Sequence, residues 1–388
     1  MKAATRVIRT QLERTHQKEH SSPLFLTSSF VFDTAEEGAA LFSGDLEGNL
    51  YSRFSNPNTD EFIARLCTLE GTETGIATAS GMSAVYVALA GHLQQGDHVV
   101  ASKALFGNSL NILQNILPKQ GITHTLVDLD DVEGWQAAIQ SNTRLLLVET
   151  PSNPTLKIAD LAFLGKLCKA HDLIYVVDNC FATPVLQQPV KWGADLVLHS
   201  ATKYIDGQGR VLGGAILGKE EWVQPCYEFL RRTGASLSPF NAWVLSKSLE
   251  TLSLRMERHS SNALQLATFL ESVEDIEQVN YPYLPSYPYF NLAQKQMDAG
   301  GGLVGCVLRG GKARGARFLN ALKIHSLTAN LGDVRSIATH PASTTHSKLS
   351  EEAQQAVGIT PGFIRFSVGL EHIDDLIEDV EQALKHSR

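Results

Sequence analysis

Long hydrophobic runs are absent from this sequence: no stretch of about 18 or more apolar residues occurs, so it offers no candidate membrane span. The beginning of the chain is polar and basic and lacks the apolar centre of a secretory signal. Positive charge is not in excess either. The formal net charge of −8 argues against a nucleic-acid partner, because such proteins present a basic surface. We therefore expect a cytoplasmic protein that binds neither membranes nor nucleic acids.

Cysteine is also scarce. The five thiols are widely spaced and form no C-x-x-C pair, which argues against a disulfide framework or a zinc ribbon. The motifs of zinc proteases, P-loop proteins and G-x-S-x-G hydrolases are missing as well. His199 and His340 stand alone, without the spacing of metal ligands, so we predict no metal site. Cys180 is expected to be a buried, unreactive thiol.

Apolar residues are plentiful, at 43% of the chain, which is enough for a large core. Residues 1–55 hold few periodic runs and are rich in Ser, Thr, Gly and Asn, so we expect them to form an extended arm. A helix is predicted next. It should begin at Asn58, which with Glu61 resembles a capping pair, and end at Gly71.

Short apolar runs follow, nearly continuous in Val, Ile and Leu, as in strands that are buried on both faces. They span residues 74–79, 98–102, 145–150, 173–179, 195–200 and 213–218. Helical patterns lie between them, as at 81–95 and 159–171. Strands that alternate with helices predict an α/β domain with a large parallel or mixed sheet. We assign residues 56–245 to this domain.

The last part of the chain has a different organisation. A long helical region should begin with Ser238 as its N-cap and Pro239 in its first turn, and we place the domain boundary inside it. Residues 246–388 then mix strands with helices, which predicts a smaller C-terminal α+β domain.

Two of the predicted strands carry polar residues at their ends. One strand ends at Asp178, and the next delivers Ser200, Thr202 and Lys203. In open α/β sheets, ligands bind beyond the carboxyl ends of the strands, so these side chains should share one crevice. Pyridoxal phosphate (PLP) requires such a set. It needs a lysine that forms a Schiff base, a carboxylate against the pyridine nitrogen, and hydroxyls for the phosphate.

The phosphate of PLP would also bind well at a helix N-terminus. Ser80, Gly81 and Met82 open a predicted helix, and Gly81 allows the backbone to come close to an anion. Each of these signals alone is more typical of an ordinary loop, cap or turn. Their conjunction, in this chain order, favours a PLP site around Lys203.

Two other classes of protein share part of the pattern. Ser200 and Lys203 form the S-x-x-K of serine acylases, but the downstream S-D-N and K-T-G motifs of that class are absent. A non-enzymatic regulator with a PLP-binding fold is a more distant alternative, and the presence of Lys203 together with Asp178 argues against it.

Seven stretches resemble the Cys/Met-metabolism family of PLP-dependent enzymes and together span nearly the whole chain. They are YSRFSNPN (51–58), ASGMSAV (79–85), ETPSNPT (149–155), VVDNCFATP (176–184), HSATKYIDGQGRVLGG (199–214), NLGDVRSIATHPASTTH (330–346) and IRFSVGLE (364–371). The resemblance implies an α/β protein of PLP-dependent transferase fold type I, the aspartate aminotransferase type. Such proteins have a large mixed sheet of the seven-stranded type and a smaller C-terminal α+β domain.

The resemblance also implies roles for the matching cofactor residues. Lys203 is the catalytic Schiff-base lysine, Asp178 pairs with the pyridine nitrogen, and Asn153 is expected near the phenolic oxygen. The residues expected to hold the phosphate are Gly81, Met82, Ser200 and Thr202.

Two further residues are expected to bind the amino-acid substrate. Arg365 should clamp the α-carboxylate through two hydrogen bonds, and Asn330 should lie beside it. Tyr51 and Arg53 match a Tyr-x-Arg pair that in this family reaches the cofactor phosphate of a neighbouring subunit. The arm 1–55 would then contribute to the neighbour, which implies a homotetramer, a dimer of dimers with shared active sites.

Phe106 departs from the family pattern, because many members have a tyrosine stacked on the cofactor at this place. Stacking is retained, but the hydroxyl is lost, so any proton for a leaving group must come from Tyr51 or Lys203. A carboxylate ester leaves readily without such help. Phe106 therefore favours an acylated homoserine over a thioether as the substrate.

Within the family, the YSRF and LFG forms, the 199–214 stretch and the length resemble the O-succinylhomoserine sulfhydrylases most. The implied reaction belongs to methionine biosynthesis. It converts O-succinyl-L-homoserine and sulfide to L-homocysteine and succinate. Cystathionine γ-synthase, O-acetylhomoserine sulfhydrylase and a cystathionine or methionine γ-lyase stay open as alternatives, as do the acyl group and the sulfur donor.

Overall fold

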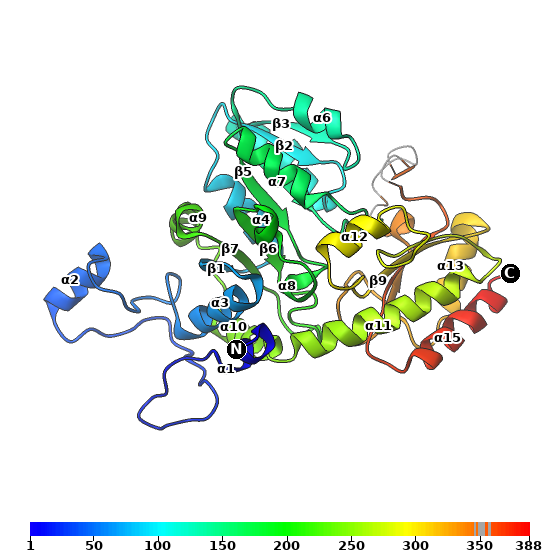
Figure 1. Ribbon diagram of the computed structural model, residues 1–388. Coiled ribbons are helices and arrows are strands. Elements are labelled where there is room, and N and C mark those ends of the chain that lie inside the picture. Colours follow the sequence, from blue (N-terminus) through cyan, green and yellow to red (C-terminus); the bar gives the residue numbers. More distant parts are fainter. Residues whose placement is uncertain (345–346, 348–353, 356–357) are drawn as a thin grey trace.

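The computed structural model describes residues 1–344, 347, 354–355 and 358–388. The end of the family-like stretch 330–346 therefore lies outside the described residues. Figure 1 shows a large sheet surrounded by helices and a smaller sheet beside it, with a long helix that runs from one to the other.

Seven strands of the described chain form the large sheet, in the order β1-β7-β6-β5-β4-β2-β3. Their bounds are β1 (Thr74–Thr78), β2 (His98–Ser102), β3 (Thr123–Val127), β4 (Thr143–Glu149), β5 (Ile174–Asp178), β6 (Leu196–Ser200) and β7 (Gly214–Gly218). Five neighbouring strands, β6, β5, β4, β2 and β3, are parallel to one another. Strand β7 is antiparallel to both of its neighbours, β1 and β6, so the sheet is mixed.

Six of these strands correspond to the six apolar runs of the sequence, whereas β3 was not predicted. Its sequence, THTLV, has no apolar run, and only Val127 among its residues is buried. As the last strand of the sheet, β3 needs fewer apolar side chains than a central strand does.

Helices cover both faces of the large sheet. On one face, α4 (Gly81–Ala90) and α9 (Glu220–Thr233) contribute to an apolar cluster with the strands. On the other face, α6 (Val132–Ala137) and α7 (Leu161–Ala170) do the same. The predicted helices at 81–95 and 159–171 are therefore confirmed, with the first ending earlier than expected.

The remaining elements near the large sheet are shorter or lie at its edge. They are α3 (Pro57–Glu70), α5 (Gly107–Asn111), α8 (Thr183–Leu186), α10 (Pro239–Leu249), a π-helical turn (Ile112–Ile116) and 3-10 turns (Leu117–Gln120, Pro189–Trp192). Ser238 caps α10 and Pro239 begins it, as predicted.

The start of α3 corrects a prediction. Its N-cap is Asn56, not Asn58, and Gly71 ends it in a left-handed conformation as expected. Asn58 instead holds the arm, because its side chain accepts a hydrogen bond from the Phe25 amide at 2.7 Å and donates to the Pro23 carbonyl at 2.8 Å. Glu61 likewise accepts from the Leu12 amide at 3.0 Å.

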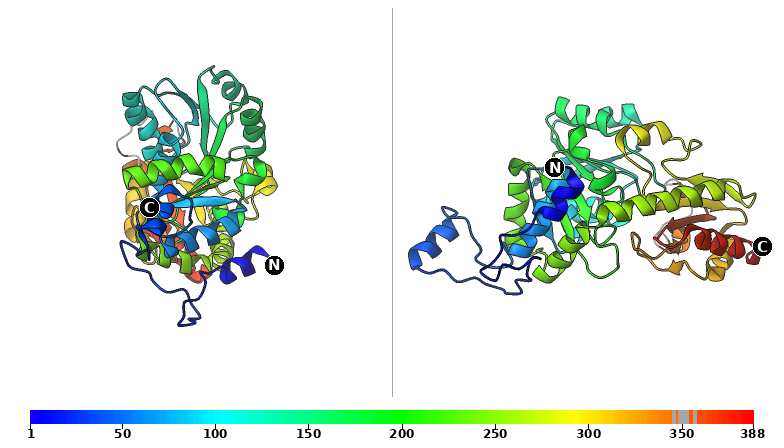
Figure 2. Two further views of the ribbon diagram at one scale, coloured as in Figure 1. Left: turned by 90° about the vertical axis from the view of Figure 1, so that its left-hand side faces the viewer. Right: turned by 60° about the horizontal axis from the view of Figure 1, so that its bottom comes forward.

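The N-terminal segment is not wholly extended. It contains α1 (Ala3–Arg9) and α2 (Ala35–Ser43), and α2 projects far from the rest of the chain (Figure 2). Large apolar side chains of this segment face outward, among them Leu26, Val31, which is 96% exposed, and Phe42. Exposed apolar surface of this kind is typical of an interface with another chain.

The smaller sheet has the order β10-β11-β12-β9-β8 within the described residues. Its strands are β8 (Ile276–Asn280), β9 (Leu303–Leu308), β10 (Ser326–Leu327), β11 (Ile337–Thr339) and β12 (Phe363–Ser367). The accompanying helices are α11 (Leu252–Glu271), α12 (Phe290–Gln296), α13 (Gly311–Ala321), α15 (Ile373–His386) and a 3-10 turn (Pro341–Ser343). The boundary proposed near residue 245 stays a prediction, and this residue lies inside α10.

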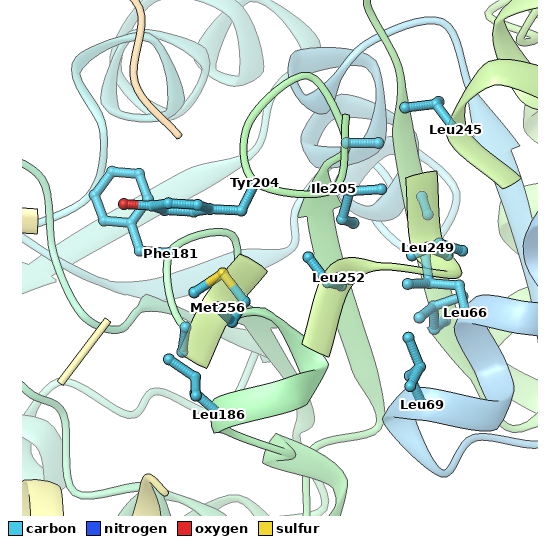
Figure 3. Packing of buried hydrophobic residues seen from close by; sticks show 14 of the residues in the cluster. Leu66, Leu69, Phe181, Leu186, Tyr204, Ile205, Leu245, Leu249, Leu252 and Met256 are labelled. Atoms are coloured by element: carbon cyan, nitrogen blue, oxygen red, sulfur yellow. The ribbon is translucent and has the colours of Figure 1, made fainter. Parts of the chain in front are cut away.

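One structural feature bears directly on the predicted site. The turn after β6 is anchored by Tyr204 and Ile205, which are buried in the apolar cluster that also contains Phe181 and Met256 (Figure 3). This packing fixes the backbone next to Lys203.

No helix of the described chain is long and apolar enough to cross a membrane.

Candidate active site

A cavity of about 430 Å³ lies where β4, β5 and β6 end, against the N-terminus of α4. This volume is within the range of small-molecule sites. The predicted site residues that line it are Gly81, Met82, Phe106, Asn153, Asp178, Ser200, Thr202, Lys203 and Arg365. Residues from both sheets therefore meet in one crevice.

Lys203 is half-buried in this cavity, and its Nζ donates a hydrogen bond to Asn330 Oδ1 at 2.8 Å. Asn330 thus belongs to the same constellation. Removal from water lowers the pKa of Lys203, and the positive charge of Arg365 lowers it further. A lowered pKa enlarges the fraction of neutral amine, which is the nucleophilic form of lysine.

Asp178 is the last residue of β5 and points its carboxyl group into the cavity. Removal from water raises its pKa, whereas the hydrogen bond from the Cys180 amide at 3.1 Å and the charge of His199 oppose this effect. A protonated ring nitrogen placed against Asp178 would favour the carboxylate form.

The N-terminus of α4 can receive an anion. Ser80 caps the helix through a hydrogen bond from the Ser83 amide at 3.1 Å. A Cβ atom at Gly81 would lie 2.5 Å from the Ser200 Cβ, so only glycine allows this helix end to meet the end of β6. The free amides of the first turn and the Ser200 hydroxyl then face the same space. The Thr202 hydroxyl accepts from the Gly213 amide at 3.1 Å.

Arg365, on β12, is a buried cation. Its side chain is 2% exposed, its Nη1 donates to Asn153 Oδ1 at 2.8 Å, and its Nη2 donates to the Asn330 carbonyl at 3.2 Å. Burial lowers its pKa to about 10, so the guanidinium stays charged at neutral pH. No carboxylate of the described residues forms an ion pair with it, and its Nε has no partner there. Such a charge is costly unless a ligand pairs with it.

The cavity residues that were not singled out as functional from the sequence include Glu149 and Cys180. Glu149, at the end of β4, accepts a hydrogen bond from the Phe106 amide at 2.6 Å. The only signal for it was its place at a strand end. Cys180 also lines the cavity, where its Sγ lies 3.7 Å from the Ser200 carbonyl oxygen. Removal from water raises the pKa of this thiol, which agrees with an unreactive role.

Tyr51 and Arg53 do not reach this cavity within one chain. Tyr51 is 43% exposed. Arg53 lies in a separate hollow of about 710 Å³, where it hydrogen-bonds the Arg231 carbonyl and sits 4.6 Å from the centre of the Phe54 ring. Their predicted role in a neighbouring subunit stays a prediction.

The constellation fits PLP on chemical grounds. It offers an amine of lowered pKa, a carboxyl group, an anion-binding helix end that requires glycine, and an aromatic ring at Phe106. Among the described residues, no group of three or more His, Cys, Asp or Glu side chains is arranged to hold a metal ion.

Comparisons with known proteins agree with this chemistry. The model of the family described as "Cys/Met metabolism PLP-dependent enzyme" matches residues 4–385. The O-succinylhomoserine sulfhydrylase of Pseudomonas aeruginosa is 45% identical over 380 residues, which cover 98% of this chain and 94% of that protein. The L-methionine gamma-lyase of Pseudomonas putida is 43% identical over 367 residues, which cover 94% of this chain and 92% of that protein.

A solved structure is similar over the full length. The Campylobacter jejuni protein assigned as an O-acetylhomoserine (thiol)-lyase superposes with a TM-score of 0.96 at 36% identity, covering 99% of this chain and 100% of that one. That structure contains a pyridoxyl-lysine 5′-monophosphate. The chain therefore belongs to the Cys/Met metabolism family of PLP-dependent enzymes, with PLP as its cofactor.

Proposed function

We propose that the protein replaces the succinyloxy group of O-succinyl-L-homoserine by sulfide, giving L-homocysteine and succinate. The observation that carries this proposal is the buried guanidinium of Arg365, which has no carboxylate partner among the described residues and shares Asn330 with the amine of Lys203. An amino acid whose α-carboxylate pairs with Arg365 would present its Cα near Lys203. The identity of 45% with an O-succinylhomoserine sulfhydrylase supports the choice of substrate.

Arg365 would bind the substrate carboxylate through a two-pronged pair, for which its planar guanidinium is suited. Its hydrogen bonds to Asn153 and Asn330 hold the guanidinium in place before the substrate arrives. A site that is organised in advance loses less free energy when it orders its ligand.

Lys203 would move the protons of the reaction. PLP, when bound, supplies an electron sink that makes the Cα and Cβ protons of an amino acid acidic. The neutral Nζ of Lys203 would accept the proton from Cα, and after releasing that proton it would accept one from Cβ, while its hydrogen bond to Asn330 Oδ1 orients it. Asp178, as a carboxylate, would accept a hydrogen bond from the protonated ring nitrogen and so help to keep it protonated.

The residues around the leaving group favour an ester. Phe106 covers the cavity but has no acidic hydrogen to donate. Succinate departs as a stable carboxylate and needs no proton, whereas a thiolate leaving group benefits from one. This difference supports γ-replacement on an acylated homoserine.

The complete active site is proposed to form between subunits of a homotetramer. Tyr51 and Arg53 lie outside the cavity of their own chain, and the segment that carries them has exposed apolar side chains. Both observations support a role of Tyr51 and Arg53 at the cofactor phosphate of a neighbour.

The experiment is a product assay with the purified enzyme. O-succinyl- and O-acetyl-homoserine are each combined with sulfide or cysteine, and homocysteine and cystathionine are quantified. The proposal predicts the highest kcat/KM for O-succinylhomoserine with sulfide. A preference for the acetyl ester or for cysteine would contradict the substrate assignment.

A second candidate is a γ-lyase, which is favoured by the 43% identity with L-methionine gamma-lyase. The control reactions contain methionine or cystathionine without sulfide, and 2-oxobutanoate and ammonia are measured. A lyase would form these products faster than the sulfide reaction forms homocysteine.

A further inference from the structure

Two carboxyl groups lie side by side in the cavity. Glu149 ends β4 and Asp178 ends β5, and the two residues are partners in the register of these parallel strands. Both line the cavity. Two carboxylates so close together in a place shielded from water cannot both be ionised at little cost, so the pair retains a proton.

The surroundings assign that proton to Glu149. Glu149 is 4% exposed, whereas Asp178 is half-buried. Burial, together with the negative charge of Asp178, raises the pKa of Glu149 well above its usual value. The neighbours of Asp178 favour its anionic form, because the Cys180 amide donates to its Oδ1 at 3.1 Å and the charge of His199 lowers its pKa.

Glu149 is also tied to the loop that carries Phe106. The Phe106 amide donates to Glu149 Oε2 at 2.6 Å. A proton on Oε1 leaves Oε2 free to accept this bond. The side chain thereby links the end of β4 to the residue before α5, whose ring lines the cavity.

We propose that Glu149 is a positioning residue of the cofactor site. Its uncharged acid holds the amide of Phe106, and so the ring that covers PLP, and it leaves Asp178 as the carboxylate that faces the ring nitrogen. The inference rests on PLP binding in this cavity and on neither the acyl group nor the sulfur donor. Measurements of cofactor binding therefore test it separately from the proposed reaction.

The test uses the holoenzyme with three variants. Glu149→Gln keeps the volume and the acceptor but cannot ionise, and Glu149→Leu removes the acceptor. The control is Asp195→Leu, since Asp195 accepts the Tyr175 amide at 2.9 Å, is half-buried and does not line the cavity. The readouts are the dissociation constant of PLP, the visible circular dichroism of bound PLP, and the pH at which its visible absorption changes.

Glu149→Gln should bind PLP within about twofold of the wild type, with the same dichroism and pH transition, because the acid acts in its neutral form. Glu149→Leu should weaken PLP binding by about tenfold or more, since a buried amide loses its acceptor, and should reduce the dichroism. Asp195→Leu should match the wild type in all three readouts, whatever its thermal stability.

A shifted pH transition in Glu149→Gln would overturn the proposal, because it would mean that Glu149 is ionised beside the cofactor. A Glu149→Leu protein with the cofactor properties of the control would also overturn it. The link to Phe106 is tested by combining Glu149→Leu with Phe106→Ala. The proposal predicts that the double variant is little worse than Phe106→Ala, whereas fully additive losses would refute action through Phe106.

Discussion

Replacement of Arg365 by methionine should separate substrate recognition from stability. The guanidinium is 2% exposed and has no carboxylate partner among the described residues, so a bound α-carboxylate would complete a buried ion pair. Removal of one member of such a pair costs about 3–5 kcal/mol. Because about 1.4 kcal/mol corresponds to a factor of ten, kcat/KM should fall by about 10²–10⁴-fold.

The substrate-free enzyme should tolerate this change. Arg365→Met loses the hydrogen bonds to Asn153 and Asn330, but it also removes a buried charge that has no counter-ion in the described part of the chain. These effects oppose each other, so the free energy of unfolding should change by less than about 2 kcal/mol. Arg365→Lys keeps the charge without the planar fork and should give an intermediate kcat/KM.

The assay compares the wild type with both variants on O-succinylhomoserine and on an analogue that lacks the α-carboxylate. The wild type should lose most of its activity on the analogue, whereas Arg365→Met should treat the two compounds nearly alike. The visible absorption of PLP serves as the control for an intact cofactor site. An unchanged KM and kcat/KM for O-succinylhomoserine in Arg365→Met would refute the assignment of Arg365 as the carboxylate clamp.

Three further predictions concern other parts of the molecule. Burial raises the pKa of Asp379, but hydrogen bonds from His325 and from nearby backbone amides outweigh this effect and lower the pKa. The ionised carboxylate of Asp379 therefore stabilises the fold at neutral pH, and this stabilisation is lost as the pH falls below about 4. Asp379→Asn should lower the free energy of unfolding at pH 7 by about 1–3 kcal/mol, and this free energy should then change less as the pH is lowered. Identical acid-unfolding curves for the wild type and the variant would contradict this prediction. Coexpressed Arg53→Ala and Lys203→Ala chains should regain activity, since hybrids of the proposed tetramer would contain intact shared sites. Inactive hybrids, once isolated, would place Arg53 at its own subunit's site. Phe106→Tyr supplies a proton donor and should increase elimination from cystathionine relative to turnover of O-succinylhomoserine, a ratio that would stay constant if the missing hydroxyl were irrelevant.

Local patterns in the sequence predicted much of the large sheet. Its central strands are buried on both faces, and their sequences are therefore nearly continuous apolar runs. β3 escaped prediction because it lies at the edge of the sheet and begins with three consecutive polar residues. The cap of α3 was misassigned because Asn56 and Asn58 are both good caps. Only the tertiary structure reveals that Asn58 binds the arm instead.

The site could be predicted where one strand end or one helix start carries the chemistry, as for Asp178, Gly81 and Lys203. The role proposed for Glu149 could not be predicted, because it depends on the pairing of Glu149 with Asp178, which lies 29 positions later along the chain. The sequence could not show either that Arg365 has no carboxylate partner within the residues that the structure describes. This depends on which carboxylates fold against β12, and the sequence contains many that do not.

Chemical trapping of the cofactor tests the central claim, that Lys203 holds PLP in this cavity. The holoenzyme is reduced with borohydride, digested, and analysed by mass spectrometry. The account predicts one pyridoxyl phosphate group per chain, on the peptide that contains Lys203, and no label in Lys203→Ala. A label on another lysine of the wild type, or an undiminished label in Lys203→Ala, would contradict it.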